Sequence, residues 1–243
     1  MPRPLTLITG GTRGIGAAVA RRLAAEGHDL VLGYARDEDA ATRMRAAVES
    51  LGASCRLVRA DLTSDEGIDA LFGEAAEAGR LAGVVNNAGA TLHIGPLTQT
   101  PSDVIRRVID LNLTSAVLVA RRAVAELAEG GVLVNISSGA ATTGSPGEYV
   151  HYAAAKAGVD ALTKGLAIEA ADRGIRVVGV APGTIDTDIH ADASDAGRVA
   201  RVAASHPLGR AGRAEEVAGV VAFALSSDAS YVTGTTIRVA GGR

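Results

Sequence analysis

The chain has 243 residues, of which 47% are hydrophobic, and its formal net charge is −3. This length can bury a large core, and the absence of any block of like charge argues against nucleic acid or an anionic membrane surface as a partner. The single cysteine, Cys55, cannot close an intramolecular disulfide, and the apolar run at residues 5–8 is too short for a signal-peptide core or a membrane span, so we expect a cytoplasmic protein.

Short apolar runs rich in β-branched residues alternate with longer alanine-rich segments of helical period. Such alternation is typical of βα units, which form a parallel sheet covered by helices on both faces. We therefore predict one α/β domain over residues 1–243, a doubly wound Rossmann fold whose ligand lies at the carboxyl ends of the strands. The seven predicted strands lie at residues 5–9, 30–34, 55–60, 81–87, 131–137, 175–181 and 235–240. The polar, glycine-punctuated segment at residues 186–212 is predicted to be a substrate lid.

The first predicted strand runs into the motif TGGTRGIG at residues 9–16, and a helical segment begins inside this motif. Gly10, Gly14 and Gly16 would let the backbone turn sharply and approach a pyrophosphate, whose charge is met by free N–H groups and the helix dipole. A tight strand-to-helix turn would also need glycine, but the position directly after the first strand favours a dinucleotide site.

The end of the second predicted strand bears on which dinucleotide is bound. NAD sites commonly carry an acidic residue there, which accepts from the ribose 2′-hydroxyl. This chain has Ala35 and Arg36 at that point, and Arg13 lies within the glycine motif. Two arginines suit a 2′-phosphate, so we predict NADPH as the cofactor. The alternative is that both arginines are ordinary surface residues and that Asp37 reaches the ribose.

Tyr152 and Lys156 lie four residues apart in an alanine-rich helical segment, and Lys156 is one of only two lysines among 24 basic residues. The spacing puts both side chains on one helix face, where an ammonium favours the ionised tyrosine and so lowers its pKa. Ser137 and Ser138 follow the fifth predicted strand, where a serine hydroxyl could donate to the carbonyl oxygen that the tyrosine protonates. Without such neighbours, this spacing would more often belong to an ordinary amphipathic helix.

Asparagines mark two further positions. The motif NNAG at residues 86–89 closes the fourth predicted strand, and Asn112 lies inside a long apolar helical segment. A buried asparagine in a helix needs hydrogen-bond partners. Asn112 could be satisfied by neighbouring backbone, or it could hold a water that returns protons to the lysine.

With these motifs, the chain resembles the short-chain dehydrogenase/reductase family along essentially its whole length. The motifs that carry the resemblance, in order along the chain, are TGGTRGIG, DL at Asp61 and Leu62, NNAG, LNL around Asn112, ISS, YAAAK, PGTIDT from Pro182 and YVTG from Tyr231. Each motif is weak alone, but their order and spacing are specific.

The resemblance implies a catalytic tetrad of Asn112, Ser138, Tyr152 and Lys156. The spacing from serine to tyrosine is one residue longer than the commonest form in the family, and Ser138 is chosen over Ser137. The resemblance also implies that Asp61 contacts adenine, that residues 87–89 line the cofactor cleft, and that Ile185 and Thr187 hold the nicotinamide carboxamide. The complete set of predicted cofactor residues is Gly10, Thr12, Arg13, Gly14, Ile15, Gly16, Ala35, Arg36, Asp61, Leu62, Asn87, Ala88, Gly89, Tyr152, Lys156, Pro182, Gly183, Ile185 and Thr187.

Within the family, the chain is most similar to the β-ketoacyl-carrier-protein reductases and the glucose-dehydrogenase-like enzymes. This implies an NADPH-dependent ketone reductase, first of all for a 3-oxoacyl thioester, with a sugar or secondary-alcohol dehydrogenase as the alternative. A regulator that binds NADP(H) without catalysis is a third hypothesis, which the complete tetrad disfavours.

The expected partners follow from the same resemblance. It implies a homotetramer and a carbonyl substrate that is either a small molecule or bound to an acidic carrier protein. Arg121, Arg122 and Arg173 could form the basic patch that a carrier needs, or they could be ordinary solvated helix ends. No metal ion is predicted.

Overall fold

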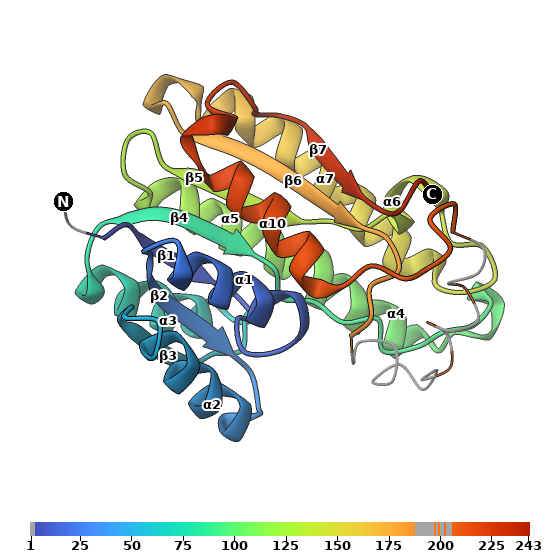
Figure 1. The fold of residues 1–243 in the computed structure, drawn as a ribbon. Helices are drawn as coiled ribbons and strands as arrows, with labels where there is room; N and C mark the ends of the chain where they lie inside the picture. The colour runs from blue at the N-terminus through green and yellow to red at the C-terminus, as the bar shows by residue number, and fades with distance from the viewer. Residues whose placement is uncertain (1–2, 188–196, 198, 200–201, 203–205) are drawn as a thin grey trace.

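The computed structural model describes residues 3–187, 197, 199, 202 and 206–243 (Figure 1). The predicted lid at residues 186–212 therefore lies largely outside the described residues. None of the described helices has both the length and the apolar character needed to cross a bilayer.

The core of the fold is a seven-stranded sheet in which every neighbouring pair is parallel. Its strands, in spatial order, are β3 (Cys55–Arg59), β2 (Asp29–Tyr34), β1 (Leu5–Ile8), β4 (Leu81–Asn86), β5 (Val132–Ile136), β6 (Arg176–Pro182) and β7 (Thr236–Val239). All seven predicted strands are present, and the predicted doubly wound fold is confirmed. The strand order reverses between β1 and β4, and ligands of such sheets bind outside the carboxyl ends of the strands at this reversal.

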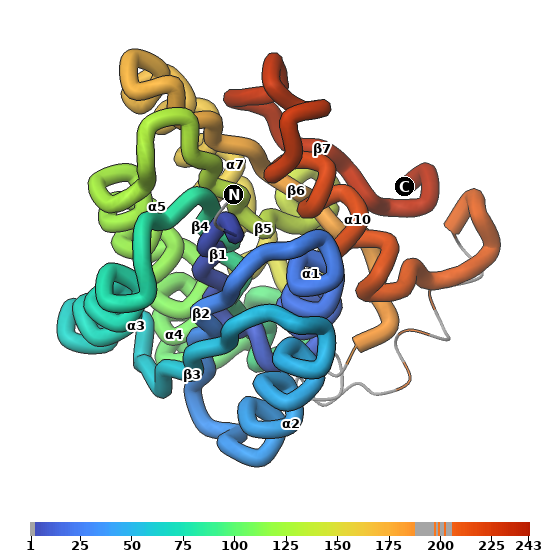
Figure 2. The backbone as a smooth tube through the Cα atoms, turned by 60° about the vertical axis from the view of Figure 1, so that its left-hand side comes forward, coloured from blue at the N-terminus to red at the C-terminus, as the bar shows by residue number. Residues whose placement is uncertain are grey.

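Helices cover both faces of the sheet (Figure 2). One face carries α1 (Gly14–Ala25), α2 (Glu38–Glu49) and α10 (Ala214–Leu225). The other face carries α3 (Asp65–Ala78), α5 (Ser115–Glu126) and α7 (Val150–Glu169). Two shorter helices, α4 (Ser102–Ile109) and α6 (Ala140–Thr143), lie near the carboxyl ends of the strands (Figure 1).

The apolar strands are explained by burial on both faces. In β5, Val132, Val134 and Ile136 pack with α1 and α10, whereas Leu133 packs with α5 and α7. Successive side chains of a strand point to opposite faces, so a strand between two helical layers is apolar at most positions. The buried exceptions in β4 and β5, Asn86 and Asn135, hydrogen-bond to each other at 3.1 Å. This leaves the strand ends and the loops after them as the places for polar chemistry.

Candidate active site

A large cavity of about 1390 Å³ runs along the carboxyl ends of the strands. It is lined by all four predicted tetrad residues and by every predicted cofactor residue except Gly16. The sequence motifs, which are spread over some 180 residues of chain, therefore meet at one site.

Gly16 lies beneath the glycine turn instead of in the cavity wall. A Cβ at this position would lie 2.1 Å from the carbonyl oxygen of Gly10 and 2.7 Å from Nδ2 of Asn87. Gly10 itself has φ +62°, a left-handed conformation that favours glycine. The N-cap residue of α1, Arg13, makes no side-chain capping bond. The first N–H groups of α1 are thus left to meet an anion at the mouth of the cavity.

The ends of β1 and β4 are held together by the residues of the NNAG motif. Thr9 Oγ1 accepts from the backbone N–H groups of Asn87 (2.8 Å) and Ala88 (2.9 Å), and Asn87 Nδ2 donates to Thr9 O (2.9 Å). These bonds fix the separation of the two strands at the point where the sheet order reverses.

Arginines dominate the end of the cavity beside β2 and β3. Arg13 and Arg36 both line it. Asp37 also lines it, but its Oδ1 accepts from the backbone N–H of Ala40 at 2.8 Å and so caps α2. This bond uses Oδ1 and leaves Oδ2 of Asp37 as an acceptor in the cavity lining.

Sequence reasoning missed Arg59, which also lines this end of the cavity. Its Nε donates to Ala35 O at 3.3 Å, which places the guanidinium next to the loop that carries Arg36. The available signal was its position as the last residue of β3, at the functional edge of the sheet. Nearby, the side chain and backbone N–H of Thr63 donate to Asp61 Oδ1 and lower the pKa of Asp61, so this carboxylate stays ionised.

Asn112 lies in a π-helical turn, Asp110–Thr114, which joins α4 to α5. The side chain is fully buried, and its Nδ2 donates to Ala90 O (2.7 Å) and Val108 O (2.9 Å) while its Oδ1 accepts from Ala90 N (3.2 Å). Of the two interpretations open from the sequence, satisfaction by backbone is thus observed. A Cβ at Gly89 would lie 2.4 Å from Asn112 Oδ1, so only glycine fits there.

Tyr152 and Lys156 lie on one face of the first turns of α7, and both are buried. Lys156 Nζ donates to Ile136 O at 2.8 Å and lies 5.7 Å from the centre of the Tyr152 ring. Burial lowers the pKa of Lys156 from 10.5 to about 8, against the opposing effect of the Asp160 carboxylate. The predicted pairing of the two side chains is therefore present in the fold.

The two serines after β5 have different surroundings. Ser137 is buried and its hydroxyl donates to the carbonyl of Lys156 at 3.3 Å, so it ties β5 to α7. Ser138 Oγ accepts from the backbone N–H of Ala140 at 3.1 Å, which leaves its hydroxyl hydrogen available to a ligand. This difference supports the choice of Ser138 over Ser137.

The far end of the cavity is lined by residues that sequence reasoning did not single out. They come from the loops after β4, β5 and β7 and from the segment before α10. The polar or aromatic members are Thr91, Thr143, Ser145, Glu148, Tyr149, His206, Arg238 and Arg243. Tyr149 packs edge-on against Tyr152, with ring centroids 5.4 Å apart.

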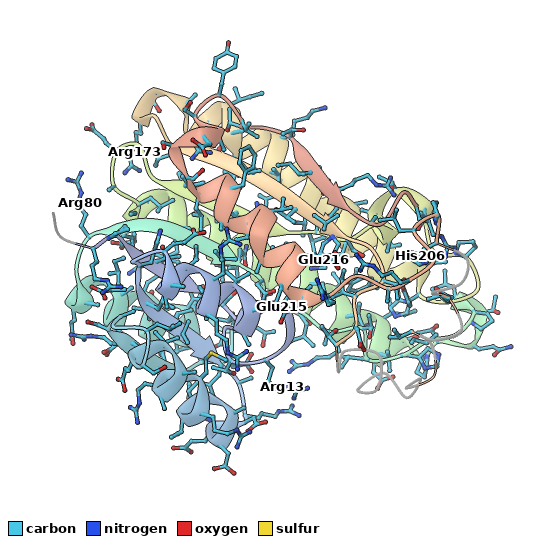
Figure 3. The ribbon with its side chains drawn as sticks, viewed as in Figure 1. Arg13, Arg80, Arg173, His206, Glu215 and Glu216 are labelled. Atoms are coloured by element: carbon cyan, nitrogen blue, oxygen red, sulfur yellow. The ribbon has the colours of Figure 1, made fainter. Side chains whose placement is uncertain are left out.

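The arginines proposed for a carrier protein lie elsewhere. Arg173 donates to the carbonyls of Val124 and Leu127, and Figure 3 shows it at the opposite end of the molecule from Arg13 and His206. Arg121 pairs with Asp65 at 3.5 Å, and Arg122 pairs with Asp69 at 3.2 Å and with Glu126 at 3.1 Å. Within one chain, these residues are bound to neighbouring groups and do not form a basic patch beside the cavity.

A family model described as enoyl-(acyl carrier protein) reductase matches residues 10–243. A 3beta-hydroxysteroid dehydrogenase from Eggerthella lenta is 42% identical over 244 residues, which covers 97% of this chain and 92% of that protein. A 3-oxoacyl-[acyl-carrier-protein] reductase from Synechocystis is 38% identical over 244 residues, which covers 98% of this chain and 96% of that protein.

Solved structures agree with these relatives. A blue fluorescent protein from a metagenomic library, in complex with NADPH, has a TM-score of 0.91 and 34% identity, with 98% of this chain and 97% of that chain covered. An NAD⁺-bound xylitol dehydrogenase has a TM-score of 0.90 and 30% identity, with 98% of both chains covered. The chain belongs to the short-chain dehydrogenase/reductase family. It is an oxidoreductase of the kind that interconverts CH–OH and C=O groups.

The residues present fit the nicotinamide dinucleotide that this family implies. The glycine turn has no room for a Cβ at Gly16, the start of α1 has no side-chain cap, and the cavity continues from there to the buried Tyr152 and Lys156. Among the described residues, there is no cluster of three or more His, Cys, Asp or Glu side chains that could hold a metal ion.

Proposed function

We propose that this protein is an NADP(H)-dependent ketone reductase in which Tyr152 exchanges a proton with the carbonyl oxygen of the substrate. The observation that carries the proposal is the buried Lys156 ammonium, held by Ile136 O beside Tyr152 in the wall of a dinucleotide-sized cavity. A lysine buried in this way is costly, and costly buried charges concentrate at functional sites.

Each member of the tetrad has a distinct role in the proposed reaction. The bound nicotinamide supplies the hydride in the reductive direction. Ser138 donates a hydrogen bond to the substrate carbonyl, and Tyr152 gives up its phenolic proton to the oxygen as negative charge develops there. Lys156 stabilises the phenolate that results, because its ammonium lies close to the ring. Asn112 is the proposed anchor of a water that restores the proton, through the second lone pair of its Oδ1.

The proposed preference for NADPH over NADH rests on Arg13 and Arg36, which line the cavity beside β2. Each arginine can donate charge-assisted hydrogen bonds to a 2′-phosphate. The NADPH complex among the structural relatives is consistent with this preference, whereas the NAD⁺ complex shows that the fold also serves the other cofactor.

For the substrate, we propose a 3-oxoacyl thioester first, as in the relative from Synechocystis. A secondary alcohol on a ring is the second candidate, because the relative from Eggerthella lenta has the higher identity and is named for a hydroxysteroid. The position of Arg173 at the far end of this chain gives the first candidate no support from a carrier-binding patch.

The decisive experiment measures initial rates of NADPH and NADH oxidation with a 3-oxobutanoyl thioester, a cyclic ketone and an aldose. We expect turnover with NADPH, and a loss of about 10²–10⁴ in kcat for Tyr152→Phe with nearly unchanged cofactor binding. If Tyr152→Phe keeps its full turnover, the proposed mechanism is wrong. Tight NADPH binding with no turnover across the panel would instead support the non-catalytic regulator.

We also propose that the chain assembles as a homotetramer. Ile168 near the end of α7 is 77% exposed, and Tyr231 is fully exposed although its side chain is large and mostly apolar. Singly exposed apolar residues are also common on monomers, so the oligomeric state itself is the test. Light scattering coupled to size-exclusion chromatography should give four times the monomer mass, and a monomer would overturn this proposal.

A further inference from the structure

The cavity has a charge balance opposite to that of the whole protein. The chain carries a formal net charge of −3. Among the residues that the structure describes, however, seven cationic side chains line the cavity against three acidic ones. The cationic residues are Arg13, Arg36, Arg59, Arg107, Lys156, Arg238 and Arg243, and the acidic residues are Asp37, Asp61 and Glu148.

Part of this excess belongs to the adenosine end. Arg13, Arg36 and Arg59 lie there with both aspartates, and Arg107 acts on the Asp61 carboxylate from α4. A 2′-phosphate and a pyrophosphate account for these arginines. They do not account for Arg238, which reaches the cavity from β7, at the other edge of the sheet.

The wall that carries Arg238 is built from the chain after β7. Ala240 lies so close to Gly183 that a Cβ at Gly183 would be 2.8 Å from its Cα. Gly241 O accepts from Leu208 N at 3.3 Å, and a Cβ at Gly241 would lie 3.8 Å from Cδ2 of His206. The end of the described chain and the segment before α10 thus form one continuous wall on the β6–β7 side, where Figure 3 shows His206.

Arg238 is held directly across from the catalytic serine loop. Its Nη1 donates to Thr142 Oγ1 at 2.9 Å, and Thr142 in turn donates to Gly139 O at 3.1 Å, one residue after Ser138. Its Nη2 donates to the carbonyl of Arg243. These bonds use two of the five N–H donors of the guanidinium and fix the direction of the other three. The side chain as a whole is exposed.

His206 adds a polar group to the same wall. It is 5% exposed, and its Nδ1 lies 2.9 Å from the carbonyl of Val202. A carbonyl can only accept, so the proton is on Nδ1 and Nε2 accepts when the ring is neutral and donates when it is protonated. The acidic side chain that lines this end among the described residues is Glu148, which comes from the turn before α7.

We propose that the carbonyl substrate carries an anionic group, a carboxylate or a phosphate, which Arg238 binds at the end of the cavity beyond Ser138. This inference rests on the proposed ketone reductase function and specifies its substrate class. A bidentate guanidinium contact fixes the position of the anion, and the substrate carbonyl then lies between the Ser138 loop and Tyr152.

The test compares matched charged and neutral substrates. A linear oxo acid such as 4-oxopentanoate is compared with its methyl ester, and 3-oxobutanoyl-CoA is compared with the neutral N-acetylcysteamine thioester. We expect kcat/KM to be at least about tenfold higher for the anionic member of one pair, because a charge-assisted hydrogen bond is lost in the neutral member. The first pair identifies a carboxylate and the second identifies a phosphate. Equal kcat/KM values within both pairs would overturn the inference.

Variants of Arg238 assign the effect to this residue. Arg238→Gln should raise KM for the anionic substrate about tenfold or more and leave kcat and the neutral substrate nearly unchanged. Arg238→Lys should recover part of the loss. Thr142→Ala removes the supporting hydrogen bond but no charge, and Arg80→Gln removes a charge far from the cavity (Figure 3), so both should keep the preference for the anion. Equal losses on charged and neutral substrates in Arg238→Gln would show a structural role and refute the inference.

A binding measurement separates this inference from the reductase proposal. Calorimetric titration of the same oxo acid and ester into the enzyme with NADP⁺ needs no turnover. If turnover is absent but the acid binds and the ester does not, the anion site stands and the proposed reaction fails. If the neutral ketone is reduced but the acid shows no advantage in rate or in binding, the reaction stands and the anion site fails.

Discussion

The buried charge of Lys156 lowers the stability of the folded protein. Burial lowers the pKa of this side chain from 10.5 to about 8. The unfolded chain therefore binds the proton more tightly, and the folded state is destabilised by a charge that is fully present below about pH 8 and disappears as the pH rises to about 10.5. Protein stability should accordingly rise with pH across this window.

Replacement of Lys156 by methionine should therefore stabilise the cofactor-free protein while abolishing turnover. We expect the free energy of unfolding at pH 7 to increase by about 2 kcal/mol, which is the cost of the buried charge less the lost hydrogen bond to Ile136 O. Urea denaturation at pH 7 and pH 9.5 measures the gain, which should shrink at the higher pH. Lys164→Met is the matched control, because Lys164 is the only other lysine and lies exposed on the same helix. A loss of stability in Lys156→Met that is the same at both pH values would contradict this account.

Arg36 should discriminate between the two cofactors. Arg36→Gln is expected to weaken NADPH binding about tenfold or more, because charge-assisted bonds to the 2′-phosphate are lost, and to leave NADH binding almost unchanged. Fluorescence titration with each cofactor gives both dissociation constants. The control is Arg21→Gln, which removes an exposed arginine of α1 that does not line the cavity. Equal losses for the two cofactors would show that Arg36 does not read the phosphate.

At the residue scale, the sequence pointed to side chains whose residue type is rare in this chain. Lys156 could be predicted because lysine is rare in a chain that otherwise uses arginine. Arg59 and Arg238 could not be recognised by residue type, because an arginine in an arginine-rich chain carries no such signal; for Arg59 the only signal was its position near the end of a predicted strand. Their relevance comes from the sheet, which brings the ends of β3 and β7 to one cavity.

Among the elements, α1 depends on a close approach to the glycine turn. Gly16→Ala should push the start of α1 away from the carbonyl of Gly10, because the added Cβ would lie 2.1 Å from that oxygen. We expect NADPH affinity to fall more than about tenfold and the free energy of unfolding to drop by about 2 kcal/mol. Gly73→Ala in α3 is the control, since a Cβ there meets nothing within 4 Å and the helix should gain up to about 1 kcal/mol. Unchanged NADPH affinity in Gly16→Ala, measured by fluorescence titration, would refute the close approach.

The elements were predictable where period and composition were strong. All seven strands follow mainly apolar runs in the sequence, since a strand buried on both faces is apolar at most positions. The helical segment around Asn112, residues 110–124, was predicted without a break, but in the structure it begins as a π-helical turn that continues α4 and only then becomes α5. A π-helical turn contains about one residue more than an α-helical turn, which barely changes the spacing of apolar side chains, so the sequence pattern does not reveal it. Such turns are frequent at functional sites. Here the turn contains Asn112, whose side chain donates to the carbonyl of Val108 within the helix and to the carbonyl of Ala90 in the loop after β4.

On the scale of the whole molecule, the strand order could not be predicted from the sequence. Most strand positions are apolar, so they do not record which neighbour a strand pairs with; the exception is the hydrogen bond of Asn86 to Asn135, which joins β4 to β5. The right-handed crossover rule limits the possible orders but leaves more than one. For the same reason, the sequence could not show that the chain after β7 would stand opposite the loop of Ser138. Assembly of the cavity is a property of the topology.

The charge balance of the whole molecule leads to a prediction about salt. The protein as a whole is negative, whereas the described lining of its cavity has four more cationic than acidic side chains. An anionic cofactor is therefore attracted by the cavity, and dissolved salt screens this attraction over a Debye length of about 10 Å at 0.1 M. Because NADPH carries a 2′-phosphate that NADH lacks, its dissociation constant should rise more steeply as KCl is increased from 0.02 to 0.5 M. Fluorescence titrations of both cofactors give the two slopes, and Arg36→Gln should bring the NADPH slope closer to that of NADH. Parallel slopes in the wild-type protein would mean that the cationic lining does not act on the 2′-phosphate.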